Sequence, residues 1–158
     1  MGTDIHIRIL KKDSSTDKWK QIKLYRKNID HIEIVKIYPY RNYELFDILN
    51  GNEEYSPDSY PIVLNHLPKN IYKEIKSNKD SIGTFGFKEI NLADLKLYLF
   101  KTPKVRDYDY NDNDSKAWKD NPVKYFIEHI EQYINFADPD FLDFRPSSEI
   151  KILYWFDC

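Results

Sequence analysis

The chain has 158 residues, enough for one domain with a hydrophobic core and few for two. Its 24 basic and 26 acidic residues leave a formal net charge of -2, and general nucleic-acid-binding proteins usually carry a basic excess. We therefore expect no general nucleic-acid binding. Aromatic residues make up 16% of the chain, which is unusual for disordered protein and indicates a folded one.

The first forty residues predict strands. Isoleucines alternate with polar residues over 3–10, which is the period of a strand with one buried face. A polar turn at 11–17 and apolar positions within 19–24 predict a second strand that forms a hairpin with the first. The apolar pattern of 31–38 predicts a third strand, which ends at Pro39 because proline cannot donate to a ladder.

A short helix is predicted over residues 42–50. Asn42 is a suitable N-cap, because its side chain can accept a hydrogen bond from a free amide of the first turn. Asn50 and Gly51 end the helix, since both residue types tolerate the left-handed conformation found after helix ends. Arg41 places a permanent positive charge beside the helix N-terminus, where anions are already favoured.

The remaining pattern completes an α+β domain. Further elements are predicted as helices over 68–76, 91–100 and 122–134, a polar loop at 77–86 and a final strand over 149–156. Strands at the two ends of a chain with helices between them are typical of an α+β fold. We expect one domain over 1–158, in which the N-terminal hairpin and the C-terminal strand form a small antiparallel sheet. Three to four helices should cover that sheet on one side.

Residues 104–121 form the most polar stretch, and we expect an exposed acidic loop there. Asp109, Asn111 and Asn113 have the spacing of a calcium loop, but Asp114 stands where that loop needs glycine. We therefore predict a solvated loop and no metal or cofactor. The side chains expected to contact a partner are Tyr108, Asp109, Tyr110, Asp112, Asp114 and Trp118.

Two groups of polar residues are candidates for a site. Asp4 and His6 lie two apart on a predicted strand and so point to one face. A carboxylate beside an imidazole suits metal binding or general-base chemistry, although a solvated strand face is the ordinary explanation. Arg41 and Asn42 could hold an anion at the helix N-terminus, or could form a cap and a surface ion pair.

Four blocks of the sequence resemble one protein family. Residues 2–6 read Gly-Thr-Asp-Ile-His, 41–46 read Arg-Asn-Tyr-Glu-Leu-Phe, 67–68 read Leu-Pro, and 154–157 read Tyr-Trp-Phe-Asp. This order is similar to that of small uncharacterised proteins found largely in phages and prophages. The family usually has a His/Ser-rich segment ending in Trp-Leu, where this chain has Thr-Phe-Gly-Phe at 84–87. The resemblance implies phage origin, and the departure weakens an enzymatic interpretation.

If the first and last strands are neighbours, Asp4, His6 and Asp157 should share one end of the sheet, with Arg41 near them. Such a group would be a structural ion-pair cluster or a small polar pocket. The absence of any recognisable nucleophile motif and the many tyrosines favour a protein that acts by binding.

We expect a phage accessory protein that inhibits a host antiviral defence protein, for example a CRISPR nuclease. The alternatives are a protein that sequesters a nucleotide-like anion through Arg41, and a metal-dependent hydrolase that uses Asp4 and His6. The single cysteine, Cys158, can form no intramolecular disulfide, and no apolar run is long enough to span a membrane. We therefore expect a location in the host cytoplasm, with no membrane association.

Overall fold

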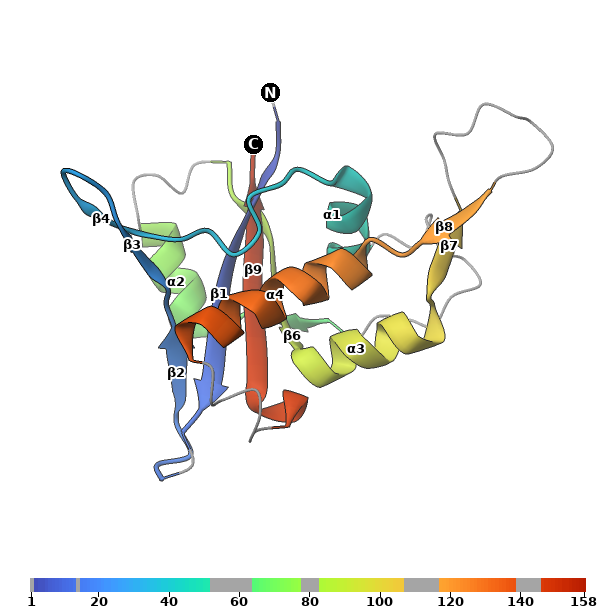
Figure 1. Ribbon diagram of the computed structural model, residues 1–158. Helices are drawn as coiled ribbons and strands as arrows, with labels where there is room; N and C mark the ends of the chain where they lie inside the picture. The colour runs from blue at the N-terminus through green and yellow to red at the C-terminus, as the bar shows by residue number, and fades with distance from the viewer. Residues whose placement is uncertain (1, 14, 52–63, 78–82, 107–116, 139–145) are drawn as a thin grey trace.

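A five-stranded antiparallel sheet forms the centre of the computed structural model (Figure 1), with strand order β2-β1-β9-β6-β5. The structure describes residues 2–13, 15–51, 64–77, 83–106, 117–138 and 146–158. The strands of this sheet are β1 (Asp4–Lys12), β2 (Trp19–Ile22), β5 (Asn65–His66), β6 (Phe85–Asn91) and β9 (Ile150–Asp157).

The first and last strands of the chain are neighbours at the centre of this sheet. They pair in continuous register from Asp4 opposite Asp157 to Lys11 opposite Ile150. The two ends of the chain therefore lie side by side, as Figure 1 shows. Because β9 has a neighbour on each side and is covered on both faces, Leu153 and Tyr154 are both fully buried although they point in opposite directions.

Helices cover both faces of the sheet. On one face, α1 (Tyr43–Leu49), α3 (Leu92–Lys101) and α4 (Val123–Ala137) form the main core with the apolar side of β1 and β9. On the other face, α2 (Lys69–Ser77) contributes Ile75 to a smaller core with Leu67 and Leu153. The expectation that helices cover one side only is thus wrong: α2 packs on the opposite face, where β9 presents the apolar residues Leu153 and Trp155.

Two further hairpins extend from this body (Figure 1). One pairs β3 (Tyr25–Lys27) with β4 (Ile32–Ile34), and the other pairs β7 (Lys104–Arg106) with β8 (Trp118–Asp120). A short 3-10 helix, η3 (Ser147–Glu149), leads into β9.

The α+β class, and the sheet built from the N-terminal hairpin and the C-terminal strand, are confirmed. Three expectations need correction. The strand expected over 31–38 is only β4, which pairs with β3 outside the central sheet. The loop expected at 77–86 overlaps the start of β6 at Phe85, and β5 and β6 were not predicted at all.

The third correction concerns the exposed loop expected at 104–121. Its two ends pair as β7 and β8, and Val105 and Asn121 are buried. The side chain of Asn121 donates to Tyr98 Oη and to the Thr102 carbonyl, each at 3.0 Å, and accepts from the Val123 amide at 3.0 Å. Asn121 therefore joins α3 to the start of α4.

Asparagine side chains cap α1, as predicted, and α3. Asn42 Oδ1 accepts from the Leu45 amide at 3.1 Å, and Asn91 Oδ1 accepts from the Ala93 amide at 2.9 Å. Gly51 has φ of 82°, the left-handed conformation that glycine supplies after a helix end.

Candidate functional site

The charged residues predicted to meet at one end of the sheet do meet there. Asp4 and Asp157 are direct cross-strand neighbours on β1 and β9. The guanidinium of Arg41 donates from Nε to Asp4 Oδ1 at 2.7 Å and from Nη2 to Oδ2 at 3.3 Å. His6 Nε2 lies 2.6 Å from Asp157 Oδ2. We call Asp4, His6, Arg41 and Asp157 the terminal cluster.

Pairing compensates the charges of the terminal cluster. Two carboxylates directly opposite one another on neighbouring strands repel. Here Arg41 pairs with Asp4, and His6 pairs with Asp157. The hydrogen bond from Arg41 lowers the pKa of Asp4, and the same bond raises the pKa of the Arg41 guanidinium. These side chains are roughly half exposed, so water and salt screen the attraction.

The absence of a side chain at Gly2 leaves room for Arg41 beside Asp4. A Cβ atom at Gly2 would lie only 2.2 Å from Arg41 Nη1, so the guanidinium lies directly against a residue without a side chain. Asn42, the next residue, uses its side chain as the cap of α1 and does not join the cluster.

His6 is held from a second direction by an aromatic ring. Its imidazole stacks on Trp155 with ring centroids 5.5 Å apart and planes 12° apart. Arg8 lies over the same indole at 5.6 Å and also pairs with Glu74 of α2. One face of β1 therefore carries a row of side chains that are already in contact with one another.

This arrangement accounts for the terminal cluster as an ion-pair group that holds the two chain ends and the start of α1 together. The fork of Arg41 is occupied by Asp4, which leaves it poorly placed to hold an anion. Among the described residues, no group of three or more His, Cys, Asp or Glu side chains is placed to hold a metal ion.

An open strand edge lies beside the terminal cluster. β1 pairs with β9 from Asp4 onward, but with β2 only from Ile9. The Asp13 amide donates to the Lys18 carbonyl, and this pair continues the register of β1 and β2. Backbone groups of an antiparallel strand point to alternate sides, so the odd-numbered residues of β1 direct their N–H and C=O groups toward the β2 side. Within the described part of the chain, no backbone hydrogen bond joins Ile5 or Ile7 to a segment on that side.

A groove of about 300 Å³ follows this open edge. One wall is residues 4–8 of β1, and the other is the segment 34–38, which leads from β4 toward α1. Ile5, Ile7 and Ile37 give the groove an apolar lining, and Lys36 is at its rim. We call it the edge groove.

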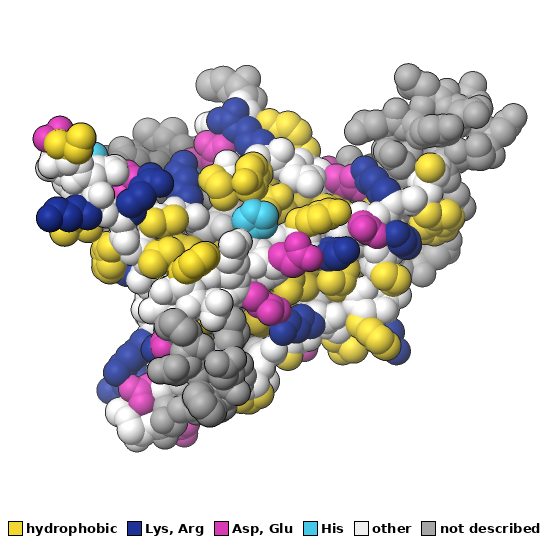
Figure 2. Space-filling model, viewed as in Figure 1, with side chains coloured by type: hydrophobic (Ala, Val, Ile, Leu, Met, Phe, Trp, Pro, Cys, Tyr) yellow, Lys and Arg dark blue, Asp and Glu magenta, His cyan; other side chains and the backbone are white. Residues whose placement is uncertain are grey.

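The β3–β4 hairpin continues the edge groove outward, because Ile34 belongs to both. This hairpin projects from the body and carries hydrophobic side chains in Figure 2. Its exposed large apolar residues are Tyr25, Ile29, Ile32 and Ile34. This surface was not predicted from the sequence, although three isoleucines within a stretch of lysine, asparagine and acidic residues are a visible signal.

The partner-contact residues predicted from the sequence receive little structural description. Tyr108, Asp109, Tyr110, Asp112 and Asp114 lie outside the described residues. Trp118 is on β8 and is 60% exposed. Asp120, near the end of the predicted acidic loop, is paired with Lys104 and lies 3.7 Å from Lys124.

Comparison with known proteins identifies no relative of this chain. No protein-family model matches the chain, and no curated protein and no solved structure matches it. None of the helices in the described ranges has the length and apolar character needed to cross a membrane.

Proposed function

We propose that the protein acts by binding a protein partner through the β3–β4 hairpin and the adjoining edge groove. The observation that carries this proposal is the hairpin's exposed apolar surface: Ile29 is fully exposed and Ile32 is 68% exposed. Full burial of one such side chain contributes about 1.5–3 kcal/mol. A projecting element with several of them has the character of the central contacts of protein interfaces.

The edge groove supports the same proposal. Ile5 and Ile7 direct backbone donors and acceptors into it, so an extended segment of a partner could add to the sheet as a further strand. Main-chain hydrogen bonds would supply affinity, and the apolar lining would select alternate side chains of the added segment.

Charge defines the partner segment further. Lys23, Lys27 and Lys36 are exposed around the hairpin and the groove, and none of the described residues forms an ion pair with them. A partner segment with an apolar centre and acidic flanks would complement this surface.

The resemblance of the sequence to phage and prophage proteins bears on the nature of the partner. This resemblance supports a phage accessory protein that works in the host cytoplasm against a host protein. We propose a protein of antiviral defence as the target, with a CRISPR nuclease as one example. The terminal cluster favours neither an anion-sequestering protein nor a metal-dependent hydrolase. The Arg41 guanidinium is bonded to Asp4, and the His6 imidazole is bonded to Asp157.

The proposal can be tested in bacteria that carry defined antiviral defence systems, a CRISPR nuclease among them. Expression of the wild-type protein should raise the number of phage plaques on one of these strains. The Ile29→Ser/Ile32→Ser double variant should lose this effect, and its affinity for the purified defence protein should fall at least tenfold, because about 1.4 kcal/mol of lost burial suffices for that.

Phe100→Ser is the matched control, because Phe100 is 78% exposed on α3, away from the hairpin. It should protect phage as well as the wild type. Equal activity of the double variant and the wild type would contradict the hairpin surface, and a wild-type protein that relieves none of the systems would contradict the defence target.

A further inference from the structure

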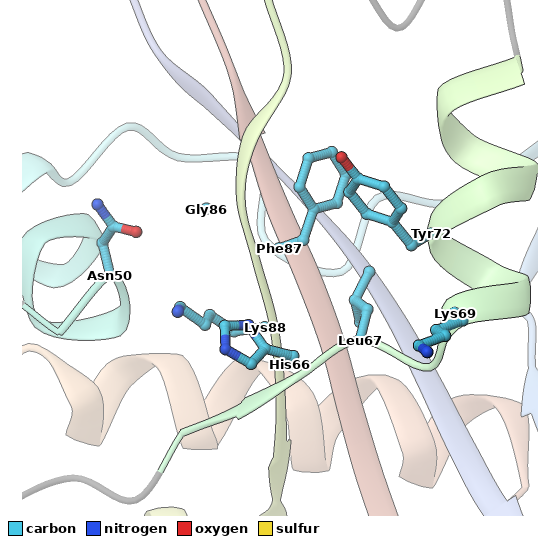
Figure 3. Close-up of a pocket in the computed structure, with 8 residues that line it drawn as sticks. All are labelled: Asn50, His66, Leu67, Lys69, Tyr72, Gly86, Phe87 and Lys88. Carbon is cyan, nitrogen blue, oxygen red and sulfur yellow. The ribbon is translucent and has the colours of Figure 1, made fainter.

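A second hollow lies at the opposite edge of the sheet. It has a volume of about 390 Å³, within the range of about 300–1,000 Å³ that is usual for ligand pockets. It lies between the end of α1, the short strand β5, the first turns of α2 and the strand β6 (Figure 3). We call it the β6 pocket.

Positive charge gathers in this pocket without a matching carboxylate. His66 and Lys88 are direct cross-strand neighbours, so their side chains share one face at a Cβ separation of about 4.5–5.5 Å. Lys69, the first residue of α2, lies at another side of the pocket (Figure 3). No acidic residue is among the described residues that line the pocket.

The other face of β6 shows how unusual this is. There the cation of Lys151 is matched by Glu89 at 3.2 Å. No ion pair joins His66, Lys69 or Lys88 to any residue of the described ranges. Lys88 is also half-buried, which makes an unmatched charge more costly than on an open surface. A bound anion would remove that cost.

The remaining walls offer a polar group and an aromatic surface. Asn50 projects toward the pocket from the end of α1 (Figure 3), and its amide can both donate and accept. The ring of Tyr72 packs edge-on against Phe87, with centroids 5.0 Å apart, and leaves part of its surface exposed. A Cβ atom at Gly86 would lie 2.9 Å from Asn50 Oδ1, so the glycine permits Asn50 to lie this close to β6.

We propose that the β6 pocket binds a small phosphorylated ligand of the nucleoside monophosphate class. The phosphate pairs with Lys88 and His66, on the side of β6 from which Asn50 approaches, and the planar base extends across the sheet edge toward Tyr72 and Lys69. This site is separate from the hairpin surface and does not depend on the protein-binding proposal. It also differs from the anion site expected at Arg41, which lies at the other end of α1.

Isothermal titration calorimetry tests this assignment with nucleoside 5′-monophosphates, inorganic phosphate and unphosphorylated nucleosides as probes. We expect saturable binding of at least one monophosphate, weaker binding of phosphate alone and still weaker binding of the nucleoside. Lys88→Gln should weaken monophosphate binding about tenfold or more, because it removes a charge-assisted hydrogen bond to the phosphate. Lys69→Gln should weaken it several-fold, because it removes a second positive charge from the pocket.

Lys18→Gln is the matched control: it removes an exposed lysine in the turn between β1 and β2, at the opposite edge of the sheet, and should leave the affinity unchanged. In two-dimensional NMR spectra of the wild type, the monophosphate should shift amides of residues 65–67, 69–72 and 86–88. The proposal is overturned if no monophosphate binds saturably, if both pocket variants bind as tightly as the wild type, or if the shifted amides lie elsewhere. The NMR result stands even if Lys88→Gln fails to fold.

Discussion

Two glycines of this chain are close to other side chains for different reasons. At Gly2 the neighbour is the guanidinium of Arg41, the far end of a flexible side chain that can move aside. At Gly86 the neighbour is the buried ring of Phe156, whose Cδ2 would lie 2.7 Å from an added Cβ. Gly86 also has φ of 66°, which is unfavourable for residues with a side chain.

Alanine substitutions should separate these two cases. Gly86→Ala should destabilise the protein by about 2–5 kcal/mol, because backbone strain adds to overpacking against Phe156. Gly2→Ala should displace Arg41 from Asp4 and leave Tm within ~2 °C of the wild type. Urea and thermal unfolding followed by circular dichroism measure both. A Gly2→Ala variant as unstable as Gly86→Ala would show that the terminal cluster contributes more than exposed ion pairs usually do.

The meeting of Asp4, His6, Arg41 and Asp157 could be predicted because only two pieces of information were needed. Strict alternation puts Asp4 and His6 on one face, and pairing of the end strands brings Asp157 to them. The opposition of His66 and Lys88 could not be predicted in this way. β5 is two residues long and has no period to detect, and the apolar alternation of β6 is interrupted by Gly86 and by the pair Lys88 and Glu89.

Between elements, one buried amide holds three parts of the fold together. Asn121 follows β8, bonds Tyr98 and the last turn of α3, and accepts from the first turn of α4. Its backbone amide also donates to the Pro103 carbonyl at 3.0 Å. An exposed loop was predicted at this residue because residues 104–121 are the most polar stretch of the chain. A local pattern carries no information about the two helices that enclose it.

Asn121→Ala should therefore cost more than the loss of an ordinary helix cap. It leaves the Val123 amide and the Thr102 carbonyl without their partner in a buried place, and we expect a loss of about 2–4 kcal/mol. Asn42→Ala is the comparison: this half-buried cap bonds the Leu45 amide and the Tyr38 side chain, and its loss should cost about 0.5–2 kcal/mol. Urea unfolding of the two variants decides the matter: equal losses would mean that the Asn121 bonds are replaced by water.

Across the whole molecule, the core is closed by its last strand. β9 lies between β1 and β6 and supplies the fully buried residues Ile152, Leu153 and Tyr154. Tyr154 also reaches the helical layer, where its hydroxyl donates to the Leu49 carbonyl at the end of α1 at 2.6 Å. The periodicity of the sequence was sufficient to predict this strand and its pairing with the N-terminus. The periodicity could not show that both faces would be covered, because it does not indicate on which face of the sheet α2 packs.

The buried tyrosines predict that stability falls in alkali. Burial raises the pKa of Tyr154, and it also raises the pKa of Tyr98 and of Tyr133. In the unfolded chain a tyrosine ionises at about pH 10, whereas in the folded protein these hydroxyls keep their protons to higher pH. Above about pH 10 the unfolded state therefore binds fewer protons than the folded one, and the free energy of unfolding decreases as pH rises.

Each protected tyrosine should contribute a slope of up to about 1.4 kcal/mol per pH unit in that range. Tyr154→Phe removes one of them. At pH 8 this variant should be less stable than the wild type by about 1–3 kcal/mol, because the Leu49 carbonyl loses its buried donor. Between pH 10 and 11 its stability should fall less steeply, so the two curves should converge. Urea midpoints measured from pH 8 to 11 test this, and parallel curves would mean that Tyr154 ionises as readily in the folded protein as in the unfolded chain.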